Sequence, residues 1–430
     1  MSQKIKICIL AAIFDIFCMY YVVYTQQSDT IKISISQAEQ MFIGKNLQLL
    51  SAKYGIDAAR AQIIQAKLWS NPNISIEQNI YNQSTKRWFD FTSSGNTDVQ
   101  VQQLFLLAGK RDKNIKVAEL NSMLTEYQLF DLMRNLKFTL RTEIFDLYYL
   151  KKALDFYDES IESVKKTIAA TEIIFQNRSI LLSELLRIKS LLFSLETERL
   201  DLVNQITSNQ SDIKVLLGDT ASKHSFYLPV LDESNMEKIR LDTLNYSHIL
   251  DYAKENRTDY KIAEVSLKQQ EANLDLQRSL AVPDISIGGR YSRQGSYIRD
   301  YFALFVSIDL PFLNQNQGNV QVAEKMIDQY KVQQETVKQG IEKDVNIAYQ
   351  KALEYEKLYK NYDKNFTKEY SSLVQSMANN YMSKNISVIQ YTDFMESYRT
   401  SMLQYNKLQN NRIDAIEALN FVAGRIVIGL

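Results

Sequence analysis

Two long stretches of the chain carry apolar side chains at helical spacing. Apolar residues recur every three or four positions, as they do along one side of a coiled-coil helix. In the second half the stripe comprises Val337, Ile341, Val345, Ala348, Ala352, Tyr355, Tyr359, Tyr362 and Phe366. In the first half it comprises Leu129, Leu132, Leu136, Leu140, Ile144, Leu147 and Leu150. The pattern predicts one helix from near Asp112 to Asn177 and another from near Asn316 to Ser383, each roughly 100 Å long.

Each long helix is flanked by helices of about half its length. The expected ranges are Ser36 to Trp69, Ile180 to Leu217, Tyr246 to Ala281 and Ile386 to Ala423. Within the first and third of these ranges, Asn46–Leu49 and Arg257–Tyr260 mark equivalent helix openings, and Pro72 and Pro283 follow the equivalent helix ends. Two half-length helices stacked end to end match one long helix, which favours the wall of a tube over a compact globule.

A pair of alternating segments lies between each half-length helix and the long helix that follows. Their apolar positions are Ile74, Ile76, Ile80, Val99, Val101 and Phe105 in the first half, and Ile285, Ile287, Tyr291, Phe302, Leu304, Val306, Ile308 and Leu310 in the second. Segments of about ten residues with this alternation are typical of transmembrane β-strands, apolar toward lipid and polar toward the lumen. Four strands cannot close a barrel in lipid, so several copies of the chain must share one.

The two halves of the chain repeat each other. The matched segments are Asn71–Ile76 with Val282–Ile287, Val117–Glu119 with Val322–Glu324, Phe175–Leu182 with Tyr381–Val388, and Leu217–Gly218 with Ala423–Gly424. We therefore predict two tandem repeats, 30–222 and 246–430, joined by a linker at 223–245. Each repeat reads half-length helix, β-hairpin, long helix, half-length helix. The fold class is mostly α with a transmembrane β-barrel part.

The first 25 residues have the features of a secretory signal peptide. Lys4 and Lys6 precede an apolar run from Ile7 to Tyr24, and the chain then becomes polar. Asp15 within the run leaves a signal anchor as an alternative, and Cys18 is an alternative lipid attachment site. Both cysteines lie in this segment, so its removal leaves no thiol for a disulfide or a cysteine metal site.

The composition excludes several function classes. The 430 residues include 50 basic and 50 acidic side chains, a balance that argues against a nucleic-acid partner. The only histidines, His224 and His248, lack ligand spacing, and the glycines form no phosphate-binding loop. We therefore expect no catalytic residue, no metal site and no cofactor.

Short motifs at the helix ends resemble those of a known family. The helix openings at Asn46–Leu49 and Asn256–Tyr260, with Pro72-Asn73 and Pro283-Asp284 before the strands, are similar to the TolC family of outer-membrane efflux proteins. The resemblance covers nearly everything after the signal segment. Ile308–Leu313, followed by Asn316-Gln317-Gly318, is similar to the branch that includes heavy-metal efflux channels.

The resemblance implies a homotrimer in the outer membrane of a Gram-negative bacterium. Three chains would form one twelve-stranded barrel among the outer-membrane lipids, continued by a long α-helical tunnel in the periplasm. The protein would be a passive duct and not an enzyme. Its partners would be a periplasmic adaptor protein and an inner-membrane pump of the resistance-nodulation-division type. The cargo would be small molecules or metal cations.

The resemblance also implies which residues carry function. The turns after the long helices would be the periplasmic tips that contact the adaptor, at Asn177, Arg178, Ser179, Ser383, Lys384 and Asn385. Arg178 and Lys384 stand where the family has glycine, and the basic tips suit either an acidic adaptor loop or simple solvation. The residues matching the family's entrance gate are Glu184, Gln390, Asp393 and Tyr381. Glu184 could pair across the tip with Tyr381 or Lys384, or along its own helix with Arg187.

Two alternatives remain open from the sequence. Within the channel class, a type I protein-secretion or drug-export channel would be built in the same way. Outside that class, a coiled-coil structural protein anchored by Ile7–Tyr24 would carry the alternating segments as soluble hairpins. Such a rod does not explain why Pro72 and Pro283 precede matched strand pairs.

Overall fold

The structure, a computed structural model, describes residues 30–219, 225–241, 244–294 and 298–429. The predicted signal peptide at 1–25, both cysteines and His224 lie outside the described residues. The chain divides into two compact units. The first contains the described part of 1–44 with Glu143–Asp232 and Met377–Asp393, and the second contains Lys45–Thr142, Glu233–Ser376 and Phe394–Leu430.

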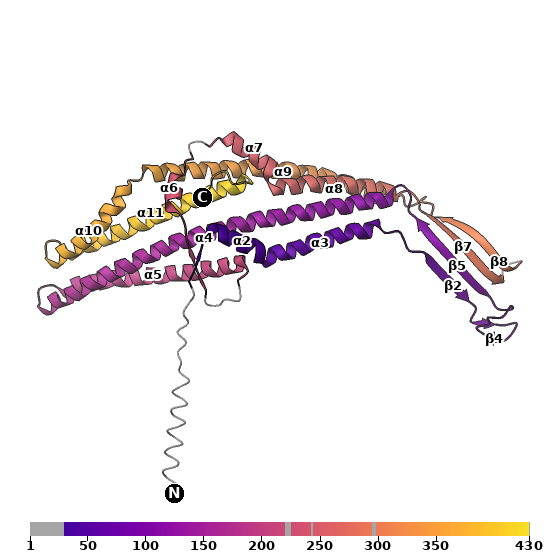
Figure 1. The fold of residues 1–430 in the computed structure, drawn as a ribbon, viewed down its shortest axis with the longest axis horizontal. Helices are drawn as coiled ribbons and strands as arrows, with labels where there is room; N and C mark the ends of the chain where they lie inside the picture. The colour runs from indigo at the N-terminus through magenta and orange to yellow at the C-terminus, as the bar shows by residue number, and fades with distance from the viewer. Residues whose placement is uncertain (1–29, 220–224, 242–243, 295–297, 430) are drawn as a thin grey trace, which may run out of the picture. The chain divides into compact units, whose positions relative to one another are not determined.

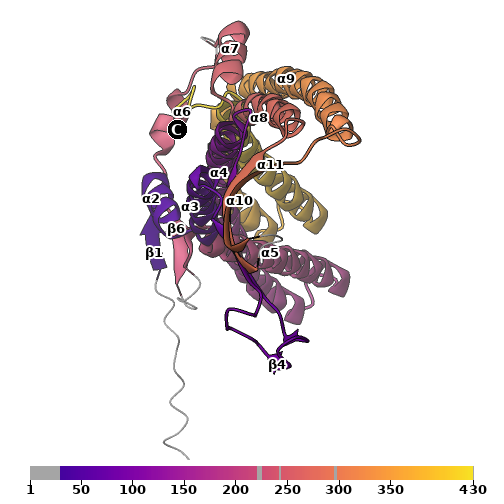
Figure 2. The same ribbon diagram turned by 90° about the vertical axis from the view of Figure 1, so that its right-hand side faces the viewer.

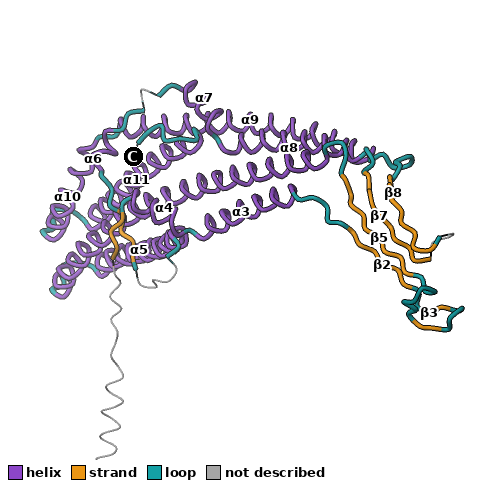
Figure 3. The backbone as a smooth tube through the Cα atoms, turned by 45° about the vertical axis from the view of Figure 1, so that its right-hand side comes forward, coloured by secondary structure: helices purple, strands orange, loops and turns teal. Residues whose placement is uncertain are grey.

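Helices make up most of both units, as the tube in Figure 3 shows. The helices are α2 (Ile35–Lys45), α3 (Leu47–Lys67), α4 (Lys110–Gln176), α5 (Leu182–Leu217), α6 (Glu233–Lys238), α7 (Tyr246–Asn256), α8 (Thr258–Leu280), α9 (Gln317–Asn361), α10 (Lys364–Met382) and α11 (Val388–Val422) (Figure 1). The strands are β1 (Thr30–Ile33), β2 (Asn73–Gln78), β3 (Tyr81–Asn82), β4 (Arg87–Trp88), β5 (Thr97–Phe105), β6 (Phe226–Pro229), β7 (Ile285–Gln294) and β8 (Arg299–Ile308). Among the described helices, none is both long and apolar enough to span a lipid bilayer.

The two predicted long helices differ in continuity. The first is confirmed, because α4 runs unbroken for 67 residues. The second prediction, from near Asn316 to Ser383, is wrong: α9 ends at Asn361, and α10 begins at Lys364. Tyr362 leaves the helix with extended dihedrals, and the Asp363 side chain accepts a hydrogen bond from the Asn365 N–H at 2.9 Å. Asp363 therefore caps a new helix where the sequence pattern predicted a continuous one.

Both half-length helices that precede the strands are also divided. The single ranges predicted from Ser36 and from Tyr246 are wrong, while the predicted openings near Asn46 and Arg257 are confirmed. The Asn46 side chain caps α3 by accepting from two backbone N–H groups, each at 3.0 Å. Arg257 separates α7 from α8 at the matched position. The other two half-length helices, α5 and α11, are continuous as predicted.

The four predicted strands form one antiparallel sheet in the order β2-β5-β7-β8, visible on the right of Figure 1. Its polar and apolar side chains separate as predicted. One face carries, in register, Ile76, Val99, Tyr291 and Phe302, with Ile74, Val101, Gly289 and Leu304 in the next row. Leu304 is 90% exposed and Phe302 is 76% exposed. The opposite face carries polar side chains such as Gln100 and Arg290, which are neighbours across β5 and β7.

A small hairpin caps the connection between β2 and β5. Strands β3 and β4 pair antiparallel, and the Asp90 side chain accepts hydrogen bonds from residues of the adjoining loops. The Asp90 carboxylate accepts hydrogen bonds from the Thr85 and Thr92 hydroxyls at 2.6 and 2.5 Å. Gly95 is required here, because a Cβ would lie 1.6 Å from the Asp90 carbonyl oxygen. This hairpin was not predicted from the sequence.

The first unit contains a second feature that the sequence analysis missed. Strands β1 and β6 pair in parallel, side by side in Figure 2, although β6 lies in the predicted linker. The Gln210 side chain holds β6 by donating to the Tyr227 carbonyl at 2.6 Å and accepting from its N–H at 3.0 Å. The two strands are only four residues long, too short for their pattern to predict a strand from the sequence.

Buried ion pairs join helices within the second unit. Arg141 of α4 donates two hydrogen bonds to Glu417 of α11, at 2.7 and 2.5 Å. Arg412 of α11 donates to Glu356 of α9 at 2.6 Å and to the Met236 carbonyl at 3.0 Å. Because charges this deeply buried are costly unless paired, the two arginines fix the register of α11 against its neighbours.

Candidate functional site

The predicted tips are two turns with the same backbone geometry. The first joins α4 to α5, and the second joins α10 to α11. Arg178 and Lys384 both adopt left-handed dihedrals, with φ of 54° and 59°. In each turn this residue's N–H donates to the carbonyl three residues earlier, Phe175 at 2.8 Å and Tyr381 at 2.9 Å. The next N–H in each turn reaches five residues back, which is the Schellman pattern.

The structure places all six predicted tip residues in these turns. Asn177, Arg178, Ser179, Ser383, Lys384 and Asn385 are all exposed. Glycine is the usual residue at a left-handed helix end, because other side chains pay about 1–2 kcal/mol there. Arg178 and Lys384 therefore hold a conformation that favours glycine and present a positive charge at each turn.

A cluster of buried polar side chains lies close to the turns, entirely within the first unit. It consists of Thr167, Thr171, Tyr381 and Tyr391. Tyr391 is 0% exposed, and its ring stacks on Tyr381 with centroids 5.5 Å apart and planes 19° apart. The Tyr391 hydroxyl lies 3.2 Å from the Thr167 hydroxyl, and either group can be the donor. Thr171 forms a hydrogen bond with Tyr381. These contacts join α4 of the first repeat to α10 and α11 of the second.

A second polar contact links the two repeats beside this cluster. The Arg187 Nε of α5 donates to the Thr392 hydroxyl of α11 at 3.2 Å. Thr392 in turn donates to the Val388 carbonyl at 3.0 Å. The Arg187–Thr392 and Thr167–Tyr391 hydrogen bonds each take one partner from each repeat, so sliding of one helical hairpin against the other would break them.

The predicted gate residues occupy different environments. Glu184 is partly exposed in the first turn of α5, and Asp393 is exposed on α11. Gln390 caps α11, since its side-chain oxygen accepts from the Ser387 N–H at 2.8 Å. Tyr381, by contrast, is buried in the cluster and does not line an open surface. The four residues therefore belong to one region but differ in accessibility.

Glu184 acts on Tyr381 through its charge. Burial raises the pKa of the Tyr381 hydroxyl, the Thr171 hydrogen bond lowers it, and the Glu184 carboxylate raises it further. Among the described residues Glu184 forms no ion pair with Lys384 or Arg187, and the Arg187 guanidinium donates to Thr392. Neither of the two predicted ion pairs with Glu184 is present.

Most of the residues that hold the turns together were not predicted from the sequence. Tyr391, Thr167, Thr171 and Thr392 were not predicted from the sequence, and Arg187 was considered only as a partner for Glu184. The register of the repeats does contain a signal, because Tyr391 stands where the first repeat has Leu185. A tyrosine at an apolar position needs a hydroxyl partner when buried, and the facing threonine supplies it.

Across the described ranges, no three His, Cys, Asp or Glu side chains are placed to share a metal ion.

Solved structures with this fold are membrane channels and related proteins. A membrane protein from Pseudomonas aeruginosa matches with a TM-score of 0.75 and 16% identity, over 93% of this chain and 92% of that one. The Campylobacter jejuni CmeC outer membrane channel matches with a TM-score of 0.74 and 14% identity, over 92% of this chain and 87% of that one. CusC, described as forming a transmembrane channel, matches with a TM-score of 0.72 and 16% identity, over 91% of this chain and 92% of that one. Identities this low establish the fold alone.

The sequence itself matches a family profile in both repeats. The profile described as outer membrane efflux protein covers residues 39–219 and 249–425. No curated protein sequence matches the chain. The two matched segments correspond to the two structural halves, each with its hairpin and its long helices. Since the profile covers most of the chain, this protein belongs to the outer membrane efflux protein family, the TolC-type, non-enzymatic channels of the Gram-negative outer membrane.

Proposed function

We propose that this channel is the passive exit duct of a tripartite efflux system and works as a homotrimer. The observation that supports this best is the four-stranded sheet, whose outer strands β2 and β8 each have an unpaired edge. One face of that sheet is apolar and exposed. An open edge in lipid leaves backbone groups without partners, so pairing β8 of one copy with β2 of the next satisfies both edges. Three copies then give a closed barrel of twelve strands.

Assembly is tested with the full chain, including its first 25 residues, in a Gram-negative host. We expect an outer-membrane species that runs as a trimer on gels until it is boiled, and that gives discrete single-channel conductance in planar bilayers. Recovery as a soluble or inner-membrane monomer without conductance would contradict the proposal. It would favour a membrane-anchored coiled coil, with the hairpins as soluble elements.

The partners proposed for the duct are a periplasmic adaptor protein and an inner-membrane pump of the resistance-nodulation-division type. The exposed turns around Arg178 and Lys384 are the surface offered to the adaptor. The Ile308–Leu313 motif is similar to the branch that includes heavy-metal efflux channels but identifies no substrate, and the proposed cargo is a metal cation or another small molecule. Deleting the gene in its own host should raise sensitivity to metal salts. Unchanged metal sensitivity with lost dye or drug export, or lost secretion of a polypeptide, would favour a drug-export or type I secretion channel.

The entrance gate is proposed at Glu184, Asp393, Gln390 and Tyr381. Three copies of the exposed Asp393 and the partly exposed Glu184 would bring carboxylates together near the axis of the trimer, and carboxylates there favour cations. Gln390 holds the first turn of α11 by capping it, and Tyr381 anchors the turn through its buried ring.

The gate is tested by replacing Glu184 and Asp393 together with alanine. We expect higher single-channel conductance and a weaker preference for cations. The matched control is Glu196→Ala, which removes a surface carboxylate of α5 that pairs with Lys165 at 2.7 Å. Equal conductance and equal cation preference in the double variant and the control would contradict the gate assignment.

A further inference from the structure

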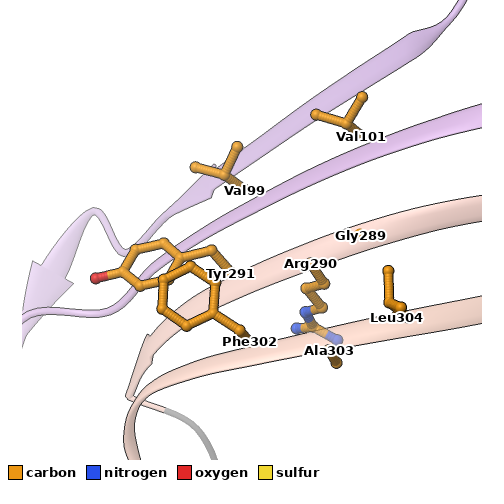
Figure 4. Close-up of a pocket in the computed structure, with 8 residues that line it drawn as sticks. All are labelled: Val99, Val101, Gly289, Arg290, Tyr291, Phe302, Ala303 and Leu304. Carbon is orange, nitrogen blue, oxygen red and sulfur yellow. The ribbon is translucent and has the colours of Figure 1, made fainter.

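A groove lies on the apolar face of the sheet, at a position where one row lacks a side chain. Ile74, Val101, Gly289 and Leu304 are partners in register across β2, β5, β7 and β8. Three of them carry large apolar side chains, and Gly289 carries none. The resulting hollow has a volume of about 440 Å³ and is lined by Val99, Val101, Gly289, Arg290, Tyr291, Phe302, Ala303 and Leu304 (Figure 4).

The backbone does not require glycine at position 289. Gly289 has no left-handed dihedrals, and a Cβ built on it would meet only the Ala303 carbonyl oxygen, at an ordinary 3.8 Å. The neighbouring Gly288 is different, because a Cβ there would lie 2.5 Å from the Val101 carbonyl oxygen and 2.5 Å from the Phe305 ring. Gly288 is therefore required by packing on the polar face. Gly289 leaves open space on the apolar face that a side chain could have filled.

One end of the groove is fixed by two aromatic rings. Tyr291 and Phe302 are neighbours across β7 and β8, with ring centroids 5.0 Å apart. The Tyr291 hydroxyl donates to the Asp300 carboxylate at 2.7 Å, which holds the ring in place. In Figure 4 these rings stand at one end of the hollow, with Val101 and Leu304 on either side of Gly289. The groove thus has aromatic rings at one end and aliphatic side chains along its sides.

We propose that this groove holds an acyl chain of an outer-membrane lipid. Its lining residues are apolar apart from Arg290 and the Tyr291 hydroxyl, and it is continuous with the exposed apolar side chains Ile74, Ile76 and Val306. The protein resides in the outer membrane, so that face meets lipid if the sheet forms the proposed barrel wall. Gly289 lies on β7, inside the sheet, so neither of the backbone edges available for pairing with another copy, those of β2 and β8, is at Gly289. The inference therefore rests on the proposed barrel and adds a lipid site to it.

The test uses the full-length trimer in vesicles of phosphatidylethanolamine with a diazirine near the middle of one acyl chain. After illumination, labelled peptides are mapped by mass spectrometry. We expect labelling concentrated at Val101, Gly289 and Leu304, several-fold above the rest of the apolar face. Gly289→Leu fills the groove and should lower that labelling several-fold. The matched control is Val306→Leu, which adds bulk on the same face of β8, outside the groove.

The outcomes separate the lipid site from the barrel. Uniform labelling along the apolar face, unaffected by Gly289→Leu, would overturn the groove and leave the barrel standing. No labelling on any strand would show that the sheet does not face lipid, which would overturn the proposed function with it. Labelling at Gly289 in a monomeric preparation that disappears in the trimer would show that a second copy covers the groove, and would also overturn the lipid assignment.

Discussion

The ring of Tyr362 stacks on the ring of Tyr405 where α9 ends, with centroids 4.4 Å apart and planes 18° apart. The Tyr362 hydroxyl is buried and has no hydrogen-bond partner among the described residues. Such a group costs free energy, because it has lost water without gaining a protein partner. Tyr362 therefore stabilises the junction through its ring, without a hydrogen bond from its hydroxyl.

The first repeat contains a different arrangement at the matching position. By the register that relates Val117–Glu119 to Val322–Glu324, Tyr362 and Asp363 correspond to Tyr157 and Asp158. Tyr157 donates to Glu198 at 2.7 Å, Asp158 pairs with Arg199 at 2.5 Å, and α4 continues without a break.

The second repeat has lost both of those partners. By the register of the turns, Glu198 and Arg199 correspond to Gln404 and Tyr405. Without the arginine, Asp363 turns to its own backbone and caps α10. The two repeats therefore share a Tyr-Asp pair, and the facing helix decides whether the long helix is continuous.

Restoring the partners should restore the helix. In the double variant Gln404→Glu with Tyr405→Arg, we expect slower amide hydrogen exchange across 361–365, because Asp363 gains an ion-pair partner and Tyr362 an acceptor. The reciprocal control is Glu198→Gln with Arg199→Tyr, which should speed exchange around Asp158. Unchanged exchange in both double variants would show that the facing helix does not set the break.

Much of the fold could be predicted from the sequence, since the repeats, the four strands and α4 follow from periodicity. The helix openings at Asn46 and Arg257 could be predicted too, but not that a separate helix ends just before each of them. The break at Tyr362 could not be predicted, because it depends on the Asp363 side chain turning to a backbone N–H group without disturbing the apolar stripe. Some residues of the candidate site could likewise be predicted from the sequence, and others could not. The turn residues follow from the repeat register, whereas the Tyr391 contact with Thr167 depends on which helix faces which.

The buried pair of Arg141 and Glu417 should contribute strongly to stability. Arg141→Met leaves the Glu417 carboxylate buried without its partner, and we expect a loss of about 3–5 kcal/mol in the free energy of unfolding. Denaturant unfolding of the purified trimer measures this. The control Lys151→Met removes a surface pair with Asp155 and should cost less than about 1 kcal/mol. Comparable losses in both variants would contradict the assignment.

The left-handed turn at Lys384 should be more stable with glycine than with alanine. Both substitutions remove the same charge, but alanine keeps the Cβ that disfavours a φ of 59°. The free energy of unfolding of Lys384→Gly should therefore exceed that of Lys384→Ala by about 1 kcal/mol. Asn177 has no positive φ, and there the order of glycine and alanine should be reversed. Thermal unfolding of the four variants checks both orders. The same order at both positions would mean that the turn geometry differs from the one described.

Alkaline pH should weaken the fold partly through Tyr405. Burial, followed by the nearby Tyr359 and Glu237, raises the pKa of the Tyr405 hydroxyl from 10.0 to about 12. A raised pKa means that the folded protein keeps a proton that the unfolded chain releases, so this stabilisation is complete below pH 10 and is lost as pH rises through about 12. Tyr405→Phe cannot release that proton, and its stability should fall less steeply between pH 10 and 12, by at most about 2 kcal/mol. The exposed Tyr54→Phe is the matched control, and equal slopes in denaturant titrations of Tyr405→Phe and the unmodified protein would contradict this role for Tyr405.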